Sequence, residues 1–133
     1  MTYLLDVNAL LALCDAAHVH HHRAEAWVIG KKEESEFVLA TSAITELGFV
    51  RVASGPAAHA IDVTTAKTAL ARLKANPVVR FVFLNDHLGV DHLPAWVRKS
   101  AQTTDGHLAA LAAAHGAQLA SFDAGIPGAE LIG

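Results

Sequence analysis

The sequence predicts a single α/β domain built around a mainly parallel β-sheet that is flanked by helices. Short apolar runs that suit buried strands alternate with longer segments that suit helices, which is the pattern of a parallel sheet covered on both faces. The chain has 133 residues, of which 53% are hydrophobic, and this is enough for a real core without disulfides or a structural metal. No repeat, linker or low-complexity tract divides it. We therefore expect one domain over residues 1–133.

Four strands are predicted, and each is a short apolar run that ends at polar residues. TYLL stops at an aspartate, and EFVLATS ends on a threonine–serine pair. RFVFL is followed by Asn-Asp, and AQLASFD ends on an aspartate. The closing turn AGIPGAELIG leaves room for a short edge strand. The predicted strands are residues 2–5, 36–42, 80–84 and 117–123.

Five helices are predicted from apolar periodicity and from start and stop signals. NALLALCDAA follows the first strand, and HHHRAEAWVIGKK is expected to end near Gly30. Thr41 and Ser42 are candidate caps for AITELGFVRVAS, which a Gly-Pro pair stops. DVTTAKTALARLKANP is amphipathic, and TTDGHLAALAAAHG has Thr103 or Thr104 as its candidate cap. The predicted helices are residues 8–17, 20–32, 43–54, 62–77 and 103–116.

Composition restricts where such a protein works and what it binds. The single cysteine, Cys14, cannot form an internal disulfide, and its apolar neighbours predict a buried, unreactive thiol. The N-terminus lacks the basic region of a signal peptide, and no stretch is long and uncharged enough to span a membrane. We expect a cytoplasmic protein without a membrane partner. The net charge of −3 argues weakly against a large basic nucleic-acid surface.

Four acidic residues occupy equivalent places in the predicted fold. Asp6 and Asp123 each follow a strand, Asp105 lies in the first turn of the last helix, and Glu46 lies about one turn into the helix after the second strand. In parallel α/β sheets these places share one edge, where ligands bind. Glu46 also shares a helix face with alanines and a valine, so it must be neutral, paired or metal-bound.

Each acid also has a simpler interpretation. Asp6 can cap the following helix, and Asp105 can complement a helix dipole. Asp123 can start a turn, and Glu46 can point outward along the helix flank. Taken singly, these interpretations are at least as good as a functional one, but four coincidences at one edge are less plausible.

Convergence of the four acids would require a cation, because like charges raise each other's pKa. Mg²⁺ and Mn²⁺ choose oxygen ligands of this kind. Two such ions would neutralise the four carboxylates and leave the other acidic and basic residues nearly balanced, so the net charge does not exclude a nucleic-acid substrate. The chemistry that follows is phosphodiester hydrolysis. The sequence has no P-loop, no GxGxxG motif and no convincing Ser-His-Asp set.

Three stretches, LLDVNALLAL, TSAITELGFVRVAS and TTDGHLAALAAAHGAQLASFD, resemble the PIN-domain ribonucleases, and among them most closely the VapC-type toxins of toxin–antitoxin pairs. The order Asp, Glu, Asp, Asp matches the acidic quartet of that family and falls on Asp6, Glu46, Asp105 and Asp123. The resemblance covers nearly the whole chain. It implies a Mg²⁺- or Mn²⁺-dependent endoribonuclease that acts on RNA, a homodimer, and a cognate antitoxin that blocks the site.

The same resemblance implies roles for residues beside the acids. Asn8 and Thr104 match polar positions that orient ligands or waters. Arg51 matches a basic position that can contact RNA phosphate. Two residues depart from the pattern: Ala124 stands where many relatives have a basic residue, and Gly106 stands where a larger residue is common. Both departures bear on substrate contacts more than on the metal site.

Other functional classes match the sequence less well. A phosphoreceiver domain needs an acid beside Asp6 and a lysine after LASFD, and a haloacid-dehalogenase-type phosphatase needs Asp-x-Asp where this chain has Asp-Val-Asn. The stronger alternative is a PIN-like protein without catalysis that acts by binding an antitoxin or RNA. The histidine-rich stretch HVHHH is interpreted as the polar start of a helix, and DHLGVDH as a loop near the mouth of the site. His107 has no obvious partner.

Overall fold

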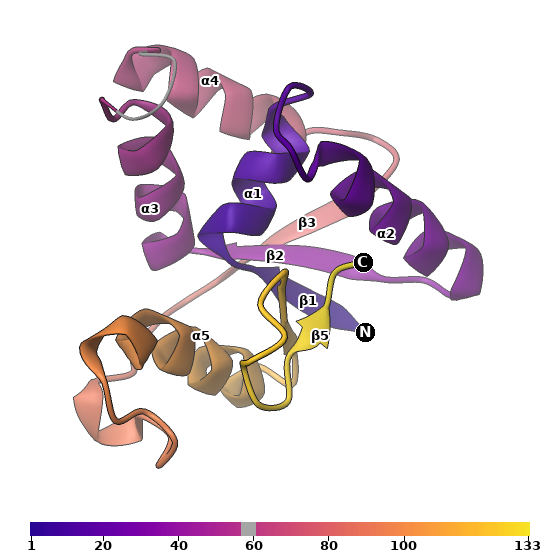
Figure 1. Cartoon of the computed structure of the whole chain (residues 1–133). Coiled ribbons are helices and arrows are strands. Elements are labelled where there is room, and N and C mark those ends of the chain that lie inside the picture. The colour runs from indigo at the N-terminus through magenta and orange to yellow at the C-terminus, as the bar shows by residue number, and fades with distance from the viewer. Residues whose placement is uncertain (57–60) are drawn as a thin grey trace.

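A five-stranded, all-parallel sheet organises the computed structural model, which describes residues 1–56 and 61–133 (Figure 1). The strand order is β3-β2-β1-β4-β5. All four predicted strands are present, and the closing segment adds the short edge strand. The strands are β1 (Thr2–Leu5), β2 (Val38–Ser42), β3 (Arg80–Leu84), β4 (Gln118–Ser121) and β5 (Glu130–Leu131).

Five α-helices lie between these strands in the described residues, as predicted, and none of them is long and apolar enough to cross a membrane. The segment between β3 and the last helix contains two 3₁₀ turns, Val90–His92 and Ser100–Gln102. The helices are α1 (Val7–Cys14), α2 (His21–Glu34), α3 (Ala43–Ala53), α4 (Val63–Lys74) and α5 (Thr103–Ala114).

The helix ends show where local signals succeed and fail. Ser42 caps α3 as predicted, in a capping box with Thr45. The helix α2, predicted over residues 20–32, ends at Glu34, two residues beyond its predicted limit. Gly30 does not stop it, because a glycine inside a helix costs only about 1 kcal/mol relative to alanine. The prediction of a threonine cap for α5 is wrong: Gln102 occupies the cap position and Thr103 is already helical.

The two faces of the sheet bury separate cores. Helices α1 to α4 gather over one face and α5 covers the other (Figure 1). Because successive strand residues point to opposite faces, Leu5 packs with Leu10 and Phe49 under the first group of helices. Leu4 packs with Leu108 on the opposite side. Both leucines are fully buried, which fixes the register of β1.

The chain changes direction across the sheet at β1. From β1 the chain builds outward through β2 to β3, and it later returns to the other side of β1 with β4, where Tyr3 lies opposite Gln118. A topological switch point therefore lies between the carboxyl ends of β1 and β4. Asp6 directly follows β1, and Asp123 lies two residues after β4. The fold thus places two of the predicted acids at the point where open α/β sheets bind ligands.

Candidate functional site

Asp6 lies at the junction of β1 and α1 and is 7% exposed. Its Oδ1 accepts a 2.8 Å hydrogen bond from the Ala9 N–H, so it caps α1 as the simpler interpretation proposed. Burial raises the pKa of Asp6, although the Ser121 hydroxyl and the Ala9 N–H favour the charged form. The neighbouring charge of Asp123 raises this pKa further. Helix capping therefore explains the position of Asp6, but it does not offset the cost of burying its negative charge.

Asp105 and Asp123 complete a group of three mutually repelling carboxylates. Burial raises the pKa of Asp105, and the charges of Asp6 and Asp123 raise it further. Asp123 is exposed, and its Oδ1 accepts a 2.8 Å hydrogen bond from the Gly125 N–H, which forms the turn expected after β4. Three acids from different parts of the sequence thus lie close enough for their charges to raise the pKa values of Asp6 and Asp105.

Glu46 is engaged differently. Its Oε2 accepts hydrogen bonds from the Thr41 hydroxyl and the Lys74 ammonium, both at 2.5 Å. The Glu46 and Lys74 side chains are 25% and 30% exposed, so the pair is partly shielded from water. The acidic charges that act on Asp6 and Asp105 do not include Glu46. The sequence predicts that a charged Glu46 is either paired with a basic residue or bound to a metal. The structure shows it paired, with Lys74.

The donor chemistry of the three aspartates suits a hard divalent cation, because such an ion would relieve the repulsion that raises the pKa values of Asp6 and Asp105. In residues 1–56 and 61–133, no three His, Cys, Asp or Glu side chains lie close enough together to hold a metal ion as they stand. One or more carboxylates would have to turn toward the others to bind an ion.

The three residues predicted to assist the acids all lie on the surface. Each is only a few residues away from one of the acids in the sequence. Asn8 is exposed in the first turn of α1, and Thr104 is exposed beside Asp105 in the first turn of α5. Arg51 is exposed in the last turn of α3. The structure leaves all three free to face solvent or a ligand.

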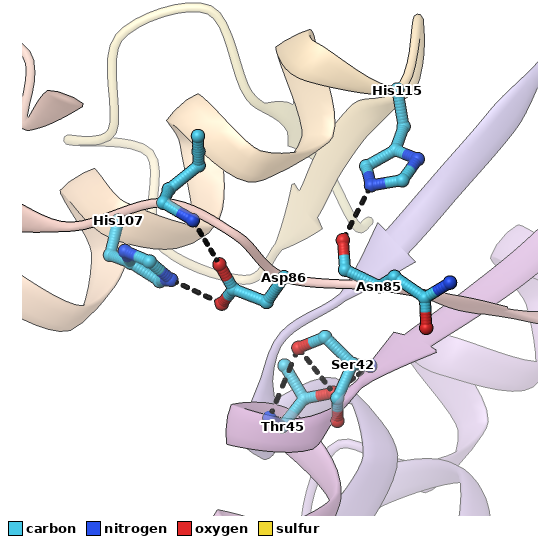
Figure 2. A network of polar contacts seen from close by, with 7 residues as sticks. Ser42, Thr45, Asn85, Asp86, His107 and His115 are labelled. Atoms are coloured by element: carbon cyan, nitrogen blue, oxygen red, sulfur yellow. Dashed lines mark hydrogen bonds and ion pairs between the residues drawn. The ribbon is translucent and has the colours of Figure 1, made fainter.

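Sequence reasoning missed a buried pair beside the site. The Nε2 atom of His107 lies 2.5 Å from Asp86 Oδ2, and both side chains are 14% exposed (Figure 2). The Leu88 N–H donates to Asp86 Oδ1 at 3.0 Å. Burial opposes ionisation of Asp86, but these hydrogen bonds prevail and lower its pKa. His107 therefore does have a partner, and the only signal in the sequence was an acid two residues after β3.

Comparison with known proteins identifies the family. A sequence model of the PIN domain matches residues 3–129. The chain belongs to the PIN-domain family. Ribonuclease VapC38 of Mycobacterium tuberculosis is 39% identical over 125 residues, which cover 92% of this chain and 86% of the relative. Ribonuclease VapC44 of the same organism is 40% identical over 137 residues, which cover 95% of this chain and 89% of the relative. These relatives confirm the resemblance to VapC-type PIN-domain ribonucleases.

Solved structures confirm the PIN fold. Mycobacterium tuberculosis VapC20, described as a sarcin-ricin loop cleaving toxin, superposes with a TM-score of 0.56 at 16% identity and covers 90% of this chain and 87% of its own. VapBC2 from Rickettsia felis, solved with a DNA fragment from its promoter, superposes with a TM-score of 0.62 at 14% identity. The match covers 98% of this chain and 97% of the VapBC2 chain. At these identities the likeness concerns the fold alone.

Proposed function

We propose that this PIN-domain protein is a divalent-metal-dependent endoribonuclease and the toxin of a toxin–antitoxin pair. The observation that carries the proposal is the gathering of three aspartates, Asp6, Asp105 and Asp123, beside the switch point of the sheet. Its relatives at about 40% identity over most of the chain are named ribonucleases. A binding protein without catalysis has no need for a group of carboxylates that repel one another.

In this proposal Asp6, Glu46, Asp105 and Asp123 are the catalytic carboxylates that hold one or two Mg²⁺ or Mn²⁺ ions. A bound ion lowers the pKa of water and stabilises charge on the phosphate and on the leaving oxygen. Asp6 is the most buried of the four, and the Ala9 N–H fixes one of its oxygens. Glu46 can contribute only if its carboxylate shares or leaves Lys74.

The surrounding residues would bind and orient the RNA. Asn8 and Thr104 stand next to the acids in the first turns of α1 and α5, where they can orient water or a carboxylate. Arg51 is exposed on α3 and can pair with a phosphate. Alanine at position 124 offers no such charge, so phosphate contacts on the β4 side must come from elsewhere.

The proposed partners follow from the VapC relatives. One structural neighbour is a VapBC complex, so we propose that a VapB-like antitoxin binds this chain and blocks its site. We also propose a homodimer that works in the cytoplasm.

The test is RNA cleavage by antitoxin-free protein in Mg²⁺, in Mn²⁺ and in EDTA, with messenger, transfer and ribosomal RNA. Asp105→Asn removes one charge from the group, and Glu33→Gln is its matched control because it also removes one carboxylate charge, at an exposed residue of α2. We expect metal-dependent cleavage that Asp105→Asn abolishes and Glu33→Gln leaves unchanged. No cleavage of any RNA in either metal would favour the binding-protein alternative, and cleavage that survives EDTA and Asp105→Asn would refute the site.

A further inference from the structure

The first turn of α5 carries Asp105 but has little local support of its own. Its cap residue, Gln102, makes no side-chain hydrogen bond to the helix. No hydrogen bond to the Asp105 carboxylate is found within the described ranges, and the neighbouring charges of Asp6 and Asp123 repel it. The position of this carboxylate must therefore be set by what holds the helix turn.

The two residues after Asp105 both contact the segment that leads from β3 to α5. Gly106 is buried, and a Cβ built on it would lie 2.1 Å from Val97 Cγ2 and 3.5 Å from Pro94 Cδ. His107 pairs with Asp86 at 2.5 Å. The contact at Gly106 leaves no room for a side chain, and the contact at His107 is a buried ion pair or charge-assisted hydrogen bond. Together they fix how far the helix turn lies from this segment and how the turn is rotated.

Asp86 is itself firmly placed. It lies two residues after the last residue of β3, and its second carboxylate oxygen accepts the Leu88 N–H at 3.0 Å. Figure 2 shows this carboxylate between the His107 ring and the backbone of its own loop. The pair thus connects an edge of the sheet to the helix turn that presents Asp105.

A second connection of the same kind joins the other end of the helix to the same loop. The Nε2 atom of His115 lies 2.7 Å from the Asn85 carbonyl oxygen (Figure 2). This tie lies ten residues after Asp105, at the end of α5, and His115 is exposed. It attaches α5 to the loop without touching the turn that carries the carboxylate, which makes it an internal control.

We propose that Asp86 and His107 are a positioning pair for Asp105, and that they hold its carboxylate where it can share a divalent cation with Asp6 and Asp123. This inference rests on the proposed function, because it assigns the pair to the metal site of the nuclease. Residues behind metal ligands orient them, and their loss typically costs 10–100-fold in metal affinity or activity. Neither residue of the pair touches the reacting phosphate in this role.

The experiment compares His107→Ala, His107→Gln and His115→Ala in three measurements. Mn²⁺ binding to RNA-free protein is measured by calorimetry, RNA cleavage is resolved into kcat and KM, and stability is measured by thermal unfolding. We expect His107→Ala to weaken Mn²⁺ binding about tenfold or more and to lower kcat similarly, with KM nearly unchanged. His107→Gln keeps an N–H donor near the position of Nε2 and should recover most of both losses.

A purely structural role predicts a different result. In that case the loss of Mn²⁺ affinity in each variant would follow its loss of thermal stability, in the same proportion for His115→Ala as for His107→Ala. His107→Gln would then not restore Mn²⁺ binding. That result would overturn the proposal. Asp86→Ala is a second route to the same test, and combining it with His107→Ala should add little further loss, because both changes remove one interaction.

The outcomes separate this proposal from the proposed function. If the wild-type protein binds Mn²⁺ but cleaves no RNA, the nuclease proposal fails, and calorimetry on the variants still decides whether the pair positions Asp105. If the wild-type protein cleaves RNA and the His107 variants behave like His115→Ala, the nuclease proposal stands and the positioning role is refuted. If the wild-type protein binds no Mn²⁺, both proposals are refuted.

Discussion

Replacing Gly106 by alanine tests how tightly the segment before α5 packs on the turn that carries Asp105. The added Cβ would lie 2.1 Å from Val97 Cγ2, whereas carbon atoms in contact stay about 3.5–4.0 Å apart. Either Val97 or the helix must therefore move by about 1.4 Å or more. The nearby Pro94 Cδ, 3.5 Å from the same point, limits one direction of escape.

The expected size of the effect follows from two opposing contributions. Overpacking of this severity costs about 2–3 kcal/mol, and replacing glycine by alanine inside a helix returns about 1 kcal/mol. The net loss in free energy of unfolding is therefore about 1–2 kcal/mol. For 133 residues, an unfolding entropy of about 2.1 cal/mol/K per residue converts this loss into a decrease in Tm of about 4–7 °C.

Thermal unfolding of Gly106→Ala beside Gly30→Ala provides the assay. Gly30 lies in α2, and a Cβ added to it would have nothing within 4 Å apart from its chain neighbours and the backbone of its own helix, so the same substitution there should raise Tm by about 4 °C. Adding Val97→Ala to Gly106→Ala removes the clashing methyl group and should produce a favourable coupling in a double-mutant cycle. If Gly106→Ala raises Tm as Gly30→Ala does, the segment does not pack on the turn and the reasoning is refuted.

Three further predictions concern charge and reactivity. Because the folded-state pKa of Asp6 is raised, metal-free protein in EDTA should gain stability as the pH falls from neutral toward that pKa. Asp6→Asn should raise Tm at pH 7 and make Tm depend less on pH. A wild-type Tm that falls between pH 7 and 5 would contradict this prediction. Burial raises the pKa of the Cys14 thiol to about 12, so labelling by a disulfide reagent at pH 8 should be far slower in folded protein than after unfolding. Lys74→Met should reduce the free energy of unfolding by about 1 kcal/mol in urea, because Glu46 loses its partner; an unchanged midpoint would show that the pair is not formed in solution.

Most of the fold could be predicted because it depends on local patterns. The strand over residues 80–84 is a run of mostly apolar side chains, and its predicted limits agree with β3 at both ends. Errors occur where tertiary contacts decide the outcome. The helix α2 ends two residues beyond its predicted limit, and Lys31 in its last turn pairs with Glu130 of β5 at 3.1 Å.

The candidate site was predictable only in part, for a similar reason. The alternation of strands and helices places acids such as Asp6 at one sheet edge, and this needs no knowledge of side-chain contacts. The partners of Glu46 and His107 could not be predicted, because Lys74 and Asp86 lie 28 and 21 residues away with no repeating pattern between them. Cys14 was expected to be buried but is only half-buried, since α1 ends at that residue instead of continuing to residue 17.

The position of β1 at the centre of the sheet has a consequence for the life of the chain on the ribosome. β1 is made first, but its neighbour β4 is made near the end, with Leu4 opposite Leu119. Asp6 therefore emerges long before Asp123, and the candidate catalytic group cannot assemble until nearly all of the described chain has been synthesised. Under the proposed function, a nascent chain therefore lacks the complete set of catalytic carboxylates while most of it is still being translated.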